Sequence, residues 1–450
     1  MEENLMQKIT ALAKRRGFVY PGSEIYGGLA NSWDYGPLGV ELKNNIKQEW
    51  WKRFVQQRSD VVGIDAALLM NPKVWEASGH LATFSDPLVE CKECQRRFRA
   101  DEIDESTISQ RKPRNDESKE WIIVGAWRCP YCNAENTKNP PRQFNLMLKT
   151  FLGPAEESAN VVYFRPETAQ AMFVNFKNIL ATSRLRVPFG IAQIGKAFRN
   201  EITPGNFIFR TREFEQMELE YFVQEREWEK WFDYWLGEMK EWLYKDLGIS
   251  ESSVEFVEIP EKDRAHYSQR TIDIEYKYPF GQKELYGLAY RSDFDLKNHF
   301  QEPPYKDPET GEASYPHVIE PTWGVDRSVL AVLLDSYAQE GDRVILKLKP
   351  KLAPYKAAVF PLVANKPELT KKAREVHDML QPRCMVAWDD RGNIGKRYYA
   401  QDEIGTPFCV TVDFETLEKN DVTVRDRDTA KQERVSLPDL PAFLMNKIYG

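Results

Sequence analysis

The sequence predicts an α+β protein in which an antiparallel β-sheet flanked by helices is followed by a smaller α/β domain. Apolar and polar residues alternate from Glu213 to Val223, which is typical of a half-buried strand, and other strand-like segments lie on both sides. From about Leu352 onward, short strand and helix patterns alternate. Residues 87–145 are charged, loop-rich and bracketed by cysteines, so we interpret them as an insertion.

Length and composition limit the class of protein. A chain of 450 residues with 42% hydrophobic residues can bury two or three cores. Its apolar runs stay below the ~20 residues that a membrane helix needs, and its first residues lack the apolar stretch of a signal peptide. We therefore expect a cytoplasmic protein with no membrane partner. The net charge of −7 argues against indiscriminate nucleic-acid binding, which depends on clustered Lys and Arg.

A long helix and a strand are expected in the N-terminal part. The helix runs from about Gly39 to Arg58, because apolar residues recur there at i+4 spacing: Leu42, Ile46, Trp50 and Phe54. Residues 60–70 follow as an apolar strand. An ordinary core helix would show much the same pattern, so this segment alone indicates no function.

The four cysteines of the insertion form two Cys-x-x-Cys pairs, Cys91 with Cys94 and Cys129 with Cys132. Two such knuckles suit a tetrahedral Zn²⁺ ion held by four thiolates, as in a zinc ribbon. Four thiolates leave no open coordination position, so the ion would be structural. Disulfide pairing is the alternative, and a cytosolic location disfavours it.

A second helix is predicted to open within Arg165 to Gln170, with Pro166 at its first position. Its apolar face follows directly: Met172, Phe173, Phe176 and Ile179. Proline at the first helical position and a glutamate just after it are ordinary helix-start signals, so simple capping is one explanation of Glu167.

Residues 198–214 form the most informative segment, a charged loop between strands expected over Phe189 to Glu201 and Glu213 to Val223. Charged side chains surround the turn: Arg199, Glu201, Arg210 and Arg212. Guanidinium groups bind phosphate, carboxylates bind amines, and the ring of Phe214 can stack on a base. A solvated charged hairpin is the alternative, and the presence of Phe214 on the charged face argues against it.

Further elements complete the first domain. We expect a helix over Trp228 to Leu247 and strands within Arg270 to Asn298. A last strand that starts at His317 leads into a helix that runs to about Gln339. Arg327 falls in the first turn of that helix, where free amide groups and the helix dipole favour anions, so its guanidinium can hold a terminal phosphate.

The second domain is expected to alternate strands and helices, which is typical of a small α/β layer. The expected elements are strands over residues 357–364, 384–389, 408–412, 422–427 and 433–436, helices over 369–380 and 396–403, and a last helix.

The charged hairpin resembles motif 2 of class II aminoacyl-tRNA synthetases, and the strand and helix around Arg327 resemble motif 3 of that family. The N-terminal helix and strand resemble motif 1, which builds the dimer interface there. Residues 165–176, RPETAQAMFVNF, closely resemble a segment of glycyl-tRNA synthetases, and residues 26–28, 33–37 and 290–296 are similar too. Over nearly its whole length the chain resembles the dimeric, α2-type glycyl-tRNA synthetases.

This resemblance implies a class II catalytic domain over residues 1–350, with the insertion at 87–145, and an anticodon-binding α/β domain over 351–450. The implied activity is that of a glycine–tRNA ligase, which activates glycine with ATP to glycyl-adenylate and transfers it to the 3′ end of tRNA(Gly). The implied partners are ATP, glycine, tRNA(Gly) and a second copy of the chain.

The resemblance also assigns the nucleotide site. The catalytic residues would be Arg199, on the α-phosphate, Glu201, and Arg327, on the γ-phosphate. The implied ATP-binding residues are Arg199, Asn200, Glu201, Phe209, Arg210, Thr211, Arg212, Glu213, Phe214, Glu284, Leu285, Gly324, Val325, Asp326 and Arg327. Mg²⁺ bound with ATP needs hard oxygen ligands, for which Glu284 is the first candidate and Glu320 the second.

Glycine offers an ammonium, a carboxylate and two hydrogens, so a selective site must hold the cation and deny space at Cα. The implied glycine-binding residues are Arg99, Glu167, Phe214, Glu215, Gln216, Met217, Glu218, Glu320, Pro321, Thr322, Trp323 and Gly324. The family commonly has serine where this chain has Thr322, and the extra methyl group should tighten the exclusion of alanine. Steric exclusion makes an editing domain unnecessary.

Two other classes of function compete with this interpretation. A synthetase-derived binding module, such as a polymerase accessory subunit, would keep the fold and lose the phosphate-binding arginines, yet Arg199 and Arg327 are present. A zinc-ribbon nucleic-acid binder would explain the cysteines and nothing else.

In the second domain, residue type alone suggests tRNA contacts at Trp388, Asp389, Arg391, Arg425 and Arg427.

Overall fold

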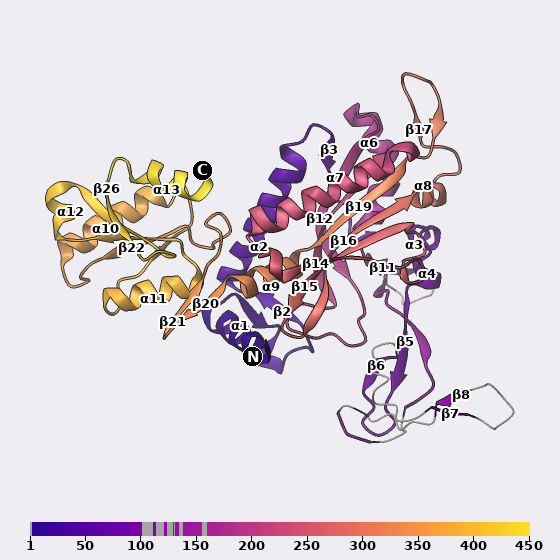
Figure 1. Ribbon diagram of the computed structural model, residues 1–450, viewed down its shortest axis with the longest axis horizontal. Coiled ribbons are helices and arrows are strands. Elements are labelled where there is room, and N and C mark those ends of the chain that lie inside the picture. Colours follow the sequence, from indigo (N-terminus) through magenta and orange to yellow (C-terminus); the bar gives the residue numbers. More distant parts are fainter. Residues whose placement is uncertain are drawn as a thin grey trace.

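A seven-stranded sheet forms the centre of the computed structural model, with strand order β14-β15-β16-β19-β13-β12-β3 (Figure 1). The structure describes residues 2–100, 111–113, 121–123, 129, 131–134, 138–154 and 160–450. Neighbouring strands of the central sheet are antiparallel except for β3, which pairs parallel with β12. The strands are β3 (Val61–Gly63), β12 (Phe189–Phe198), β13 (Glu213–Val223), β14 (Val254–Glu258), β15 (Arg270–Tyr278), β16 (Gly281–Ser292) and β19 (His317–Gly324).

The alternation along β13 separates two environments. Met217, Leu219 and Tyr221 are fully buried in the largest core cluster, which also contains Trp50 and Trp235 of the covering helices. The helices that contribute to this cluster are α1 (Glu2–Arg16), α2 (Pro37–Trp51), α7 (Trp228–Glu241) and α9 (Val325–Ser336). The intervening residues of β13 are turned to the opposite face and carry the polar groups of the site.

Shorter elements surround the central sheet, several of them on its polar face. A smaller apolar cluster forms there around Phe173, Phe176 and Phe222. The short helices are α3 (Pro72–Ala77), α4 (His80–Thr83), α5 (Ala169–Val174), α6 (Phe176–Ser183) and α8 (Phe294–His299). The small strands are β1 (Val19–Pro21), β2 (Trp33–Tyr35), β4 (Leu69–Met70), β10 (Lys149–Phe151), β11 (Val161–Phe164), β17 (Tyr305–Lys306) and β18 (Ala313–Ser314).

Several expected boundaries were wrong. The strand expected over residues 60–70 is divided, because β3 joins the central sheet while β4 pairs with β11. Between them the buried Arg165 side chain donates to the Ala66 carbonyl, at 3.0 Å, so the chain is held away from the sheet. The helix expected to open at Pro166 starts only at Ala169, since residues 165–168 are held outside it by such contacts.

Two long helices extend to or near their predicted ends, and a third ends earlier. The N-terminal helix α2 and the later helix α7 each continue as a short π-helix, at Lys52–Gln56 and Trp242–Leu247. Helix α9 ends at Ser336 rather than Gln339, because the chain then forms β20 (Tyr337–Glu340), which pairs with β21 (Arg343–Leu346).

The C-terminal part forms a five-stranded sheet with its own core, in the order β23-β22-β24-β25-β26. Its elements are β22 (Ala357–Pro361), α10 (Pro367–Leu380), β23 (Val386–Trp388), α11 (Ile394–Ile404), β24 (Phe408–Val412), α12 (Phe414–Lys419), β25 (Asp421–Asp426), β26 (Gln432–Ser436) and α13 (Leu440–Tyr449). Only α12 is absent from the predicted order. This helix has six residues and begins at a capping box between Asp413 and Thr416, a signal that hydrophobic periodicity does not contain. The division at residues 350 and 351 stays a prediction.

A buried ion-pair network joins the two parts of the chain. Asp402 of α11 is 0% exposed and accepts from Arg343 of β21, at 2.8 Å, and from Arg425 of β25, at 2.9 and 3.1 Å. Nearby, Glu403 pairs with Arg16 of α1, and Ile404 belongs to the largest core cluster. The last turn of α11 is therefore fixed to the first part of the chain by charge and by apolar packing.

The insertion is an arm that extends from the body of the protein (Figure 1). Its three-stranded sheet has the order β6-β5-β9, with β5 (Ser85–Glu90), β6 (Arg97–Arg99) and β9 (Arg142–Asn145). A two-stranded pair, β7 (Arg111–Pro113) and β8 (Trp121–Ile123), lies beyond it. The predicted insertion thus falls only partly within the described residues.

In the part of the chain that the structure describes, no helix has the length and hydrophobicity that crossing a membrane requires.

Replacing Asp402 with asparagine should destabilise the whole chain strongly, because two arginines would be left around a buried site without its negative charge. We expect a loss of roughly 3–5 kcal/mol in the free energy of unfolding, measured by urea titration. The control is Glu415→Gln, which breaks the exposed 3.1 Å pair with Lys419 and should cost no more than about 0.5 kcal/mol. Equal unfolding midpoints for the two variants would contradict the structural role of Asp402.

Candidate active site

A pocket opens on the polar face of the central sheet, between the β12–β13 hairpin, β16 and the start of α9. Eleven of the residues expected to bind ATP line it: Arg199, Glu201, Phe209, Arg210, Thr211, Phe214, Glu284, Leu285, Gly324, Asp326 and Arg327. The structure thus brings the predicted hairpin and the predicted helix start to one cavity.

Four residues expected to bind ATP do not line this pocket. Arg212 and Glu213 line an adjoining cavity instead, and the Arg212 guanidinium donates to the Ala30 carbonyl at 3.2 Å. Val325 is fully buried in the core. Asn200 uses its backbone amide to bind the Leu146 carbonyl, at 2.8 Å.

Arg199 is held at the mouth of the pocket from two directions. Its Nε donates to the Pro166 carbonyl at 3.1 Å, and its guanidinium lies 5.4 and 5.3 Å from the ring centres of Phe84 and Phe214. Cation–π contacts on two rings restrict the guanidinium. A restricted guanidinium is suited to hold an anionic group in a defined position.

The second arginine of the pocket, Arg327, is fixed against β16. Its Nη1 donates to the Glu284 carbonyl at 2.9 Å and lies 3.3 Å from the Glu284 carboxylate. The Arg327 charge lowers the pKa of Glu284, so this carboxyl stays ionised at neutral pH. The guanidinium also lies 4.5 Å from the ring centre of Phe209.

Asp326 fixes the first turn of α9 to the rest of the site. It accepts from the Tyr35 hydroxyl at 2.6 Å, from Lys43 at 3.0 Å and from the backbone amide of Glu215 at 2.8 Å. Both of its carboxylate oxygens are therefore used within the protein. Asp326 lines the pocket, but its contacts indicate that it holds Arg327 in place.

Two acceptors near the pocket are buried without a donor. Neither Glu201 Oε2 nor Gln216 Oε1 receives a hydrogen bond from a described residue. Buried acceptors normally have a partner, so an unpaired one in a cavity indicates where a donor group of a ligand can bind. An adenine amino group and an ammonium group are donors of that kind.

The glutamates expected to bind glycine lie deeper on the same face. Glu218 accepts from the Thr322 hydroxyl at 3.0 Å and from the Thr168 hydroxyl. Glu320 accepts two hydrogen bonds from Arg291, at 2.9 and 3.0 Å. The carboxylates of Glu218, Glu220 and Glu320 approach within 4.8 Å of one another. The structure thus gathers several acidic groups at one buried place.

A chain of buried hydrogen bonds holds these carboxylates. Arg291 donates to Asp295 at 2.7 and 2.8 Å. Gln170 Nε2 connects Asp295, at 3.2 Å, with Glu167, at 3.0 Å, and His80 Nε2 lies 3.4 Å from the other Glu167 oxygen. Fixed carboxylates need no rearrangement when a cation binds between them.

Sequence reasoning missed four members of this chain and one neighbour: His80, Gln170, Arg291, Asp295 and Glu220. Gln170 and Arg291 lie within strings that were noted for their resemblance, but nothing local showed that their side chains meet. Glu220 is 0% exposed, and neither of its oxygens has a donor among the described residues. Its place two residues after Glu218 on the same strand face was the signal that could have found it.

Several residues expected to bind glycine are turned elsewhere. Met217 and Trp323 are fully buried on the apolar face, where Trp323 contacts Trp50 and Phe54, and Pro321 shares their side of β19. The Glu215 carboxylate binds Lys43 and Lys47, each at 3.0 Å. Arg99 lies on the arm and pairs with Asp86 at 2.7 Å. The two-residue period of the strands places Met217, Pro321 and Trp323 away from the pocket, whereas Glu215 lines it with its carboxylate bound to the two lysines. Of the rest of that set, Phe214, Gln216, Thr322 and Gly324 line the cavity, and Glu167, Glu218 and Glu320 are the buried glutamates described above.

Burial and mutual repulsion set the charge of the carboxylates. Burial and the neighbouring Glu167 raise the pKa of Glu218, while burial and Glu320 raise the pKa of Glu220 well above its ordinary value. Burial raises the pKa of Glu320 to about 8 against the opposing effect of Arg291. Glu167 differs, because His80 and Arg291 overcome the effect of burial and lower its pKa.

The two carboxylates expected to hold Mg²⁺ are not brought together. Glu284 lines the nucleotide pocket, whereas Glu320 is bound to Arg291. Asp273 is a closer companion of Glu284, because burial together with the charge of Glu284 raises the Asp273 pKa to about 7. Glu284 is therefore the better placed of the two expected ligands.

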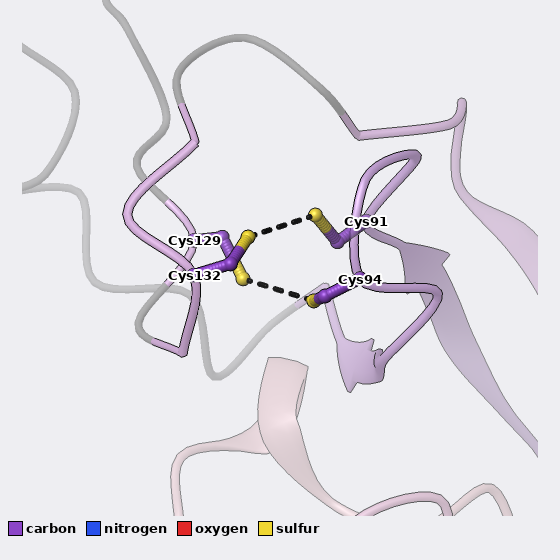
Figure 2. A group of neighbouring side chains, drawn as sticks. All are labelled: Cys91, Cys94, Cys129 and Cys132. Atoms are coloured by element: carbon purple, nitrogen blue, oxygen red, sulfur yellow. Dashed lines mark hydrogen bonds between the residues drawn. The ribbon is translucent and has the colours of Figure 1, made fainter.

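The four cysteines of the arm face one another in two pairs, as Figure 2 shows. The Sγ atoms of Cys91 and Cys132 are 3.7 Å apart, and those of Cys94 and Cys129 are 3.6 Å apart. Zn–S bonds of ~2.3 Å in a tetrahedron place the sulfurs ~3.8 Å apart, whereas a disulfide requires ~2.05 Å. The donor set and its spacing thus fit Zn²⁺ better than disulfides.

Comparison with known proteins identifies the family. The family described as "tRNA synthetase class II core domain (G, H, P, S and T)" matches residues 154–337, and "Anticodon binding domain" matches residues 356–447. The chain is 52% identical to the glycine–tRNA ligase of Alkaliphilus metalliredigens, over 98% of each chain. It is also 52% identical to the Clostridium acetobutylicum glycine–tRNA ligase, over 99% of each, and to that of Geobacillus thermodenitrificans, over 98% of this chain and 97% of the relative.

The chain belongs to the glycine–tRNA ligase family. This membership confirms the predicted class II fold, with its antiparallel sheet, its four-cysteine insertion and its anticodon-binding α/β domain. Sequence identity at this level along the full length also argues against the two competing interpretations, namely a zinc-ribbon nucleic-acid binder and a synthetase-derived binding module without catalytic activity.

The acidic cluster should make glycine binding depend on pH. A glycine ammonium bound among these carboxylates would compete with protons, and burial raises the Glu320 pKa to about 8. Binding therefore releases a proton below that pH, so the KM for glycine should fall as pH rises from about 6 to about 8, by at most about tenfold per pH unit. ATP–pyrophosphate exchange at varied glycine concentration measures this. A glycine KM that stays constant or rises over this range would contradict it.

Proposed function

We propose that the chain attaches glycine to tRNA(Gly) in two steps at the pocket on the polar face of the central sheet. A carboxylate oxygen of glycine attacks the α-phosphorus of ATP, and the bond to the leaving pyrophosphate breaks, giving glycyl-adenylate. A terminal ribose hydroxyl of tRNA then attacks the carbonyl carbon, and AMP leaves. The observation that supports this best is the junction of an arginine-lined cavity with a buried group of carboxylates.

The first step needs alignment and charge neutralisation more than acid–base chemistry. Arg199 would bind the α-phosphate, because its guanidinium is held by two rings and the Pro166 carbonyl. Arg327 would bind the γ-phosphate at the start of α9, where helix amides also favour anions. Glu284, ionised beside Arg327, would hold Mg²⁺, which supplies further positive charge against the phosphates.

Adenine would bind near Phe214, whose ring offers a stacking surface in the pocket. The unpaired Oε2 of Glu201 supports a hydrogen bond from the adenine amino group. These contacts would orient the nucleotide so that its α-phosphorus faces the glycine site.

Glycine selectivity would depend on charge and on space. Glu167, Glu218 and Glu320 would surround the ammonium, and the unpaired Gln216 Oε1 would accept one of its hydrogens. The Thr322 hydroxyl is bound to Glu218, which fixes the orientation of the threonine side chain at the pocket wall. A larger amino acid would then meet this wall at Cα, and steric exclusion of this kind can be strong.

The second domain would bind the anticodon, and the structure narrows the candidate residues. Arg391 is 92% exposed, and Trp388 presents a ring that Arg374 covers at 3.5 Å. Arg425 and Arg427 are buried, and they bind Asp402 and the carbonyls of Leu348 and Gly405. These two arginines are therefore structural, and tRNA contacts are better sought at exposed positions such as Arg391.

Three further assignments complete the proposal. The four-cysteine cluster would hold a structural Zn²⁺ ion that stabilises the arm. Two copies of the chain would form a dimer through the surface that includes α2, as motif 1 does in this class. Ile25 and Tyr26, both 87% exposed, offer a further apolar surface. The place of action would be the cytoplasm.

Purified protein should catalyse ATP–pyrophosphate exchange with glycine and not with alanine or serine. Arg199→Ala should lower exchange by about 100-fold or more, since one positioned donor to a charged transition state contributes that much. Arg212→Ala is the matched control, because this arginine belongs to the same hairpin and does not line the pocket. Absence of exchange with glycine would refute the proposed function, and substantial activity of Arg199→Ala would refute the role of that residue.

Metal analysis tests the cysteine cluster. One Zn²⁺ per chain is expected, and Cys94→Ser should abolish it because three thiolates no longer close the tetrahedron. Cys409→Ser serves as the control, since this buried cysteine belongs to the second domain. Protein without zinc, or zinc that survives Cys94→Ser, would contradict the assignment.

A further inference from the structure

His80 is a buried histidine that lies next to the proposed glycine site. It is the first residue of α4, it is 6% exposed, and its ring packs between Trp75, at 5.6 Å, and Phe84, at 5.2 Å between ring centres. The preceding Gly79 has a φ of 82°, which lets the chain turn so that Ser78 and His80 lie side by side. The ring is therefore held by packing on two sides.

Both nitrogens of the ring have a partner. Ser78 Oγ lies 2.8 Å from Nδ1, and Glu167 Oε2 lies 3.4 Å from Nε2. An ionised carboxylate can only accept, so Nε2 carries the hydrogen that points at Glu167. In a neutral ring Nδ1 then accepts, and the Ser78 hydroxyl donates to it. The carboxylate thus selects the form of the histidine that faces it, and the serine satisfies the other ring nitrogen.

Glu167 depends on such contacts for its orientation. It precedes α5, which starts at Ala169, so no helical backbone sets the direction of its side chain. Gln170 binds one carboxylate oxygen at 3.0 Å, and His80 faces the other. Removing His80 would leave one oxygen without its donor and would free the carboxylate to rotate.

We propose that Ser78 and His80 form a positioning pair for glycine recognition, in which His80 fixes Glu167 in the orientation that binds the ammonium group. This inference rests on the proposed function, since it concerns the same pocket. His80 acts through Glu167 and does not touch the substrate. Its residue type and its serine partner give the carboxylate a directed hydrogen bond that packing alone would not supply.

Two substitutions separate the hydrogen bond from the packing of the ring. His80→Phe keeps an aromatic ring between Trp75 and Phe84 and removes the donor, whereas His80→Gln keeps an N–H donor. We expect His80→Phe to raise the glycine KM about tenfold or more, as loss of a buried hydrogen bond to a charged group does, with the ATP KM changed less than about twofold. His80→Gln should recover most of the loss. His266→Phe, at an exposed histidine, should change neither constant.

Ser78→Ala gives a second test that leaves the histidine ring in place. Without the serine, Nδ1 loses its hydrogen bond and the ring loses one of its two polar anchors, so the glycine KM should rise about threefold while the protein stays folded. This variant decides the question if His80→Phe does not fold.

The outcomes distinguish this inference from the proposed function. Wild-type protein that fails to exchange with glycine overturns both. Exchange by the wild type together with an unchanged glycine KM in His80→Phe overturns the inference alone. The same holds if His80→Gln is as impaired as His80→Phe, if the ATP and glycine KM values rise equally, or if Ser78→Ala has the wild-type glycine KM. A selective rise in the glycine KM that glutamine reverses supports the positioning pair.

Discussion

The buried guanidinium of Arg291 makes the acidic pocket possible. It is 1% exposed, and the nitrogens of its planar fork donate four hydrogen bonds, two to Asp295 and two to Glu320. Burying charged groups costs several kcal/mol each unless they are paired. One cation cannot balance every carboxyl group gathered here: Glu167, Glu218, Glu220, Asp295 and Glu320. Burial raises the pKa of Glu218, Glu220 and Glu320. Some carboxyl groups of the free pocket therefore carry a proton, which the ammonium of a ligand would replace.

The central sheet sets the positions of the polar side chains of the pocket. Register between β13 and β19 places Glu218 opposite Thr322 and Gln216 opposite Gly324. The same register directs Met217 and Trp323 to the opposite face, where they anchor the strands in the largest core cluster. A slip of one residue would exchange the two faces, so the apolar core and the acidic pocket specify each other.

Much of the fold and part of the site could be predicted because their signals are local. The alternation of β13 gave its bounds from Glu213 to Val223, and two Cys-x-x-Cys pairs with a shared chemistry indicated a cluster that the structure assembles. Side chains that meet through tertiary contacts could not be predicted in this way. His80 reaches Glu167 from a helix far away in the sequence, and the Glu320 carboxylate is taken by Arg291 rather than offered to a metal. Arg425 looked like a tRNA contact because residue type carries no information on burial.

The junction between the two parts of the chain bears on the proposed tRNA reaction. An anticodon lies far from the acceptor end of its tRNA, so a protein that reads one and reacts with the other must hold its two sites at a set separation. Asp402 meets this need by binding Arg343 and Arg425 in a buried network. The neighbouring Ile404 enters the largest core cluster. Apolar packing gives this junction its stability, and the paired charges fix its orientation, because a buried carboxylate tolerates few alternative arrangements. These contacts would hold the second domain in a defined orientation against the first part of the chain.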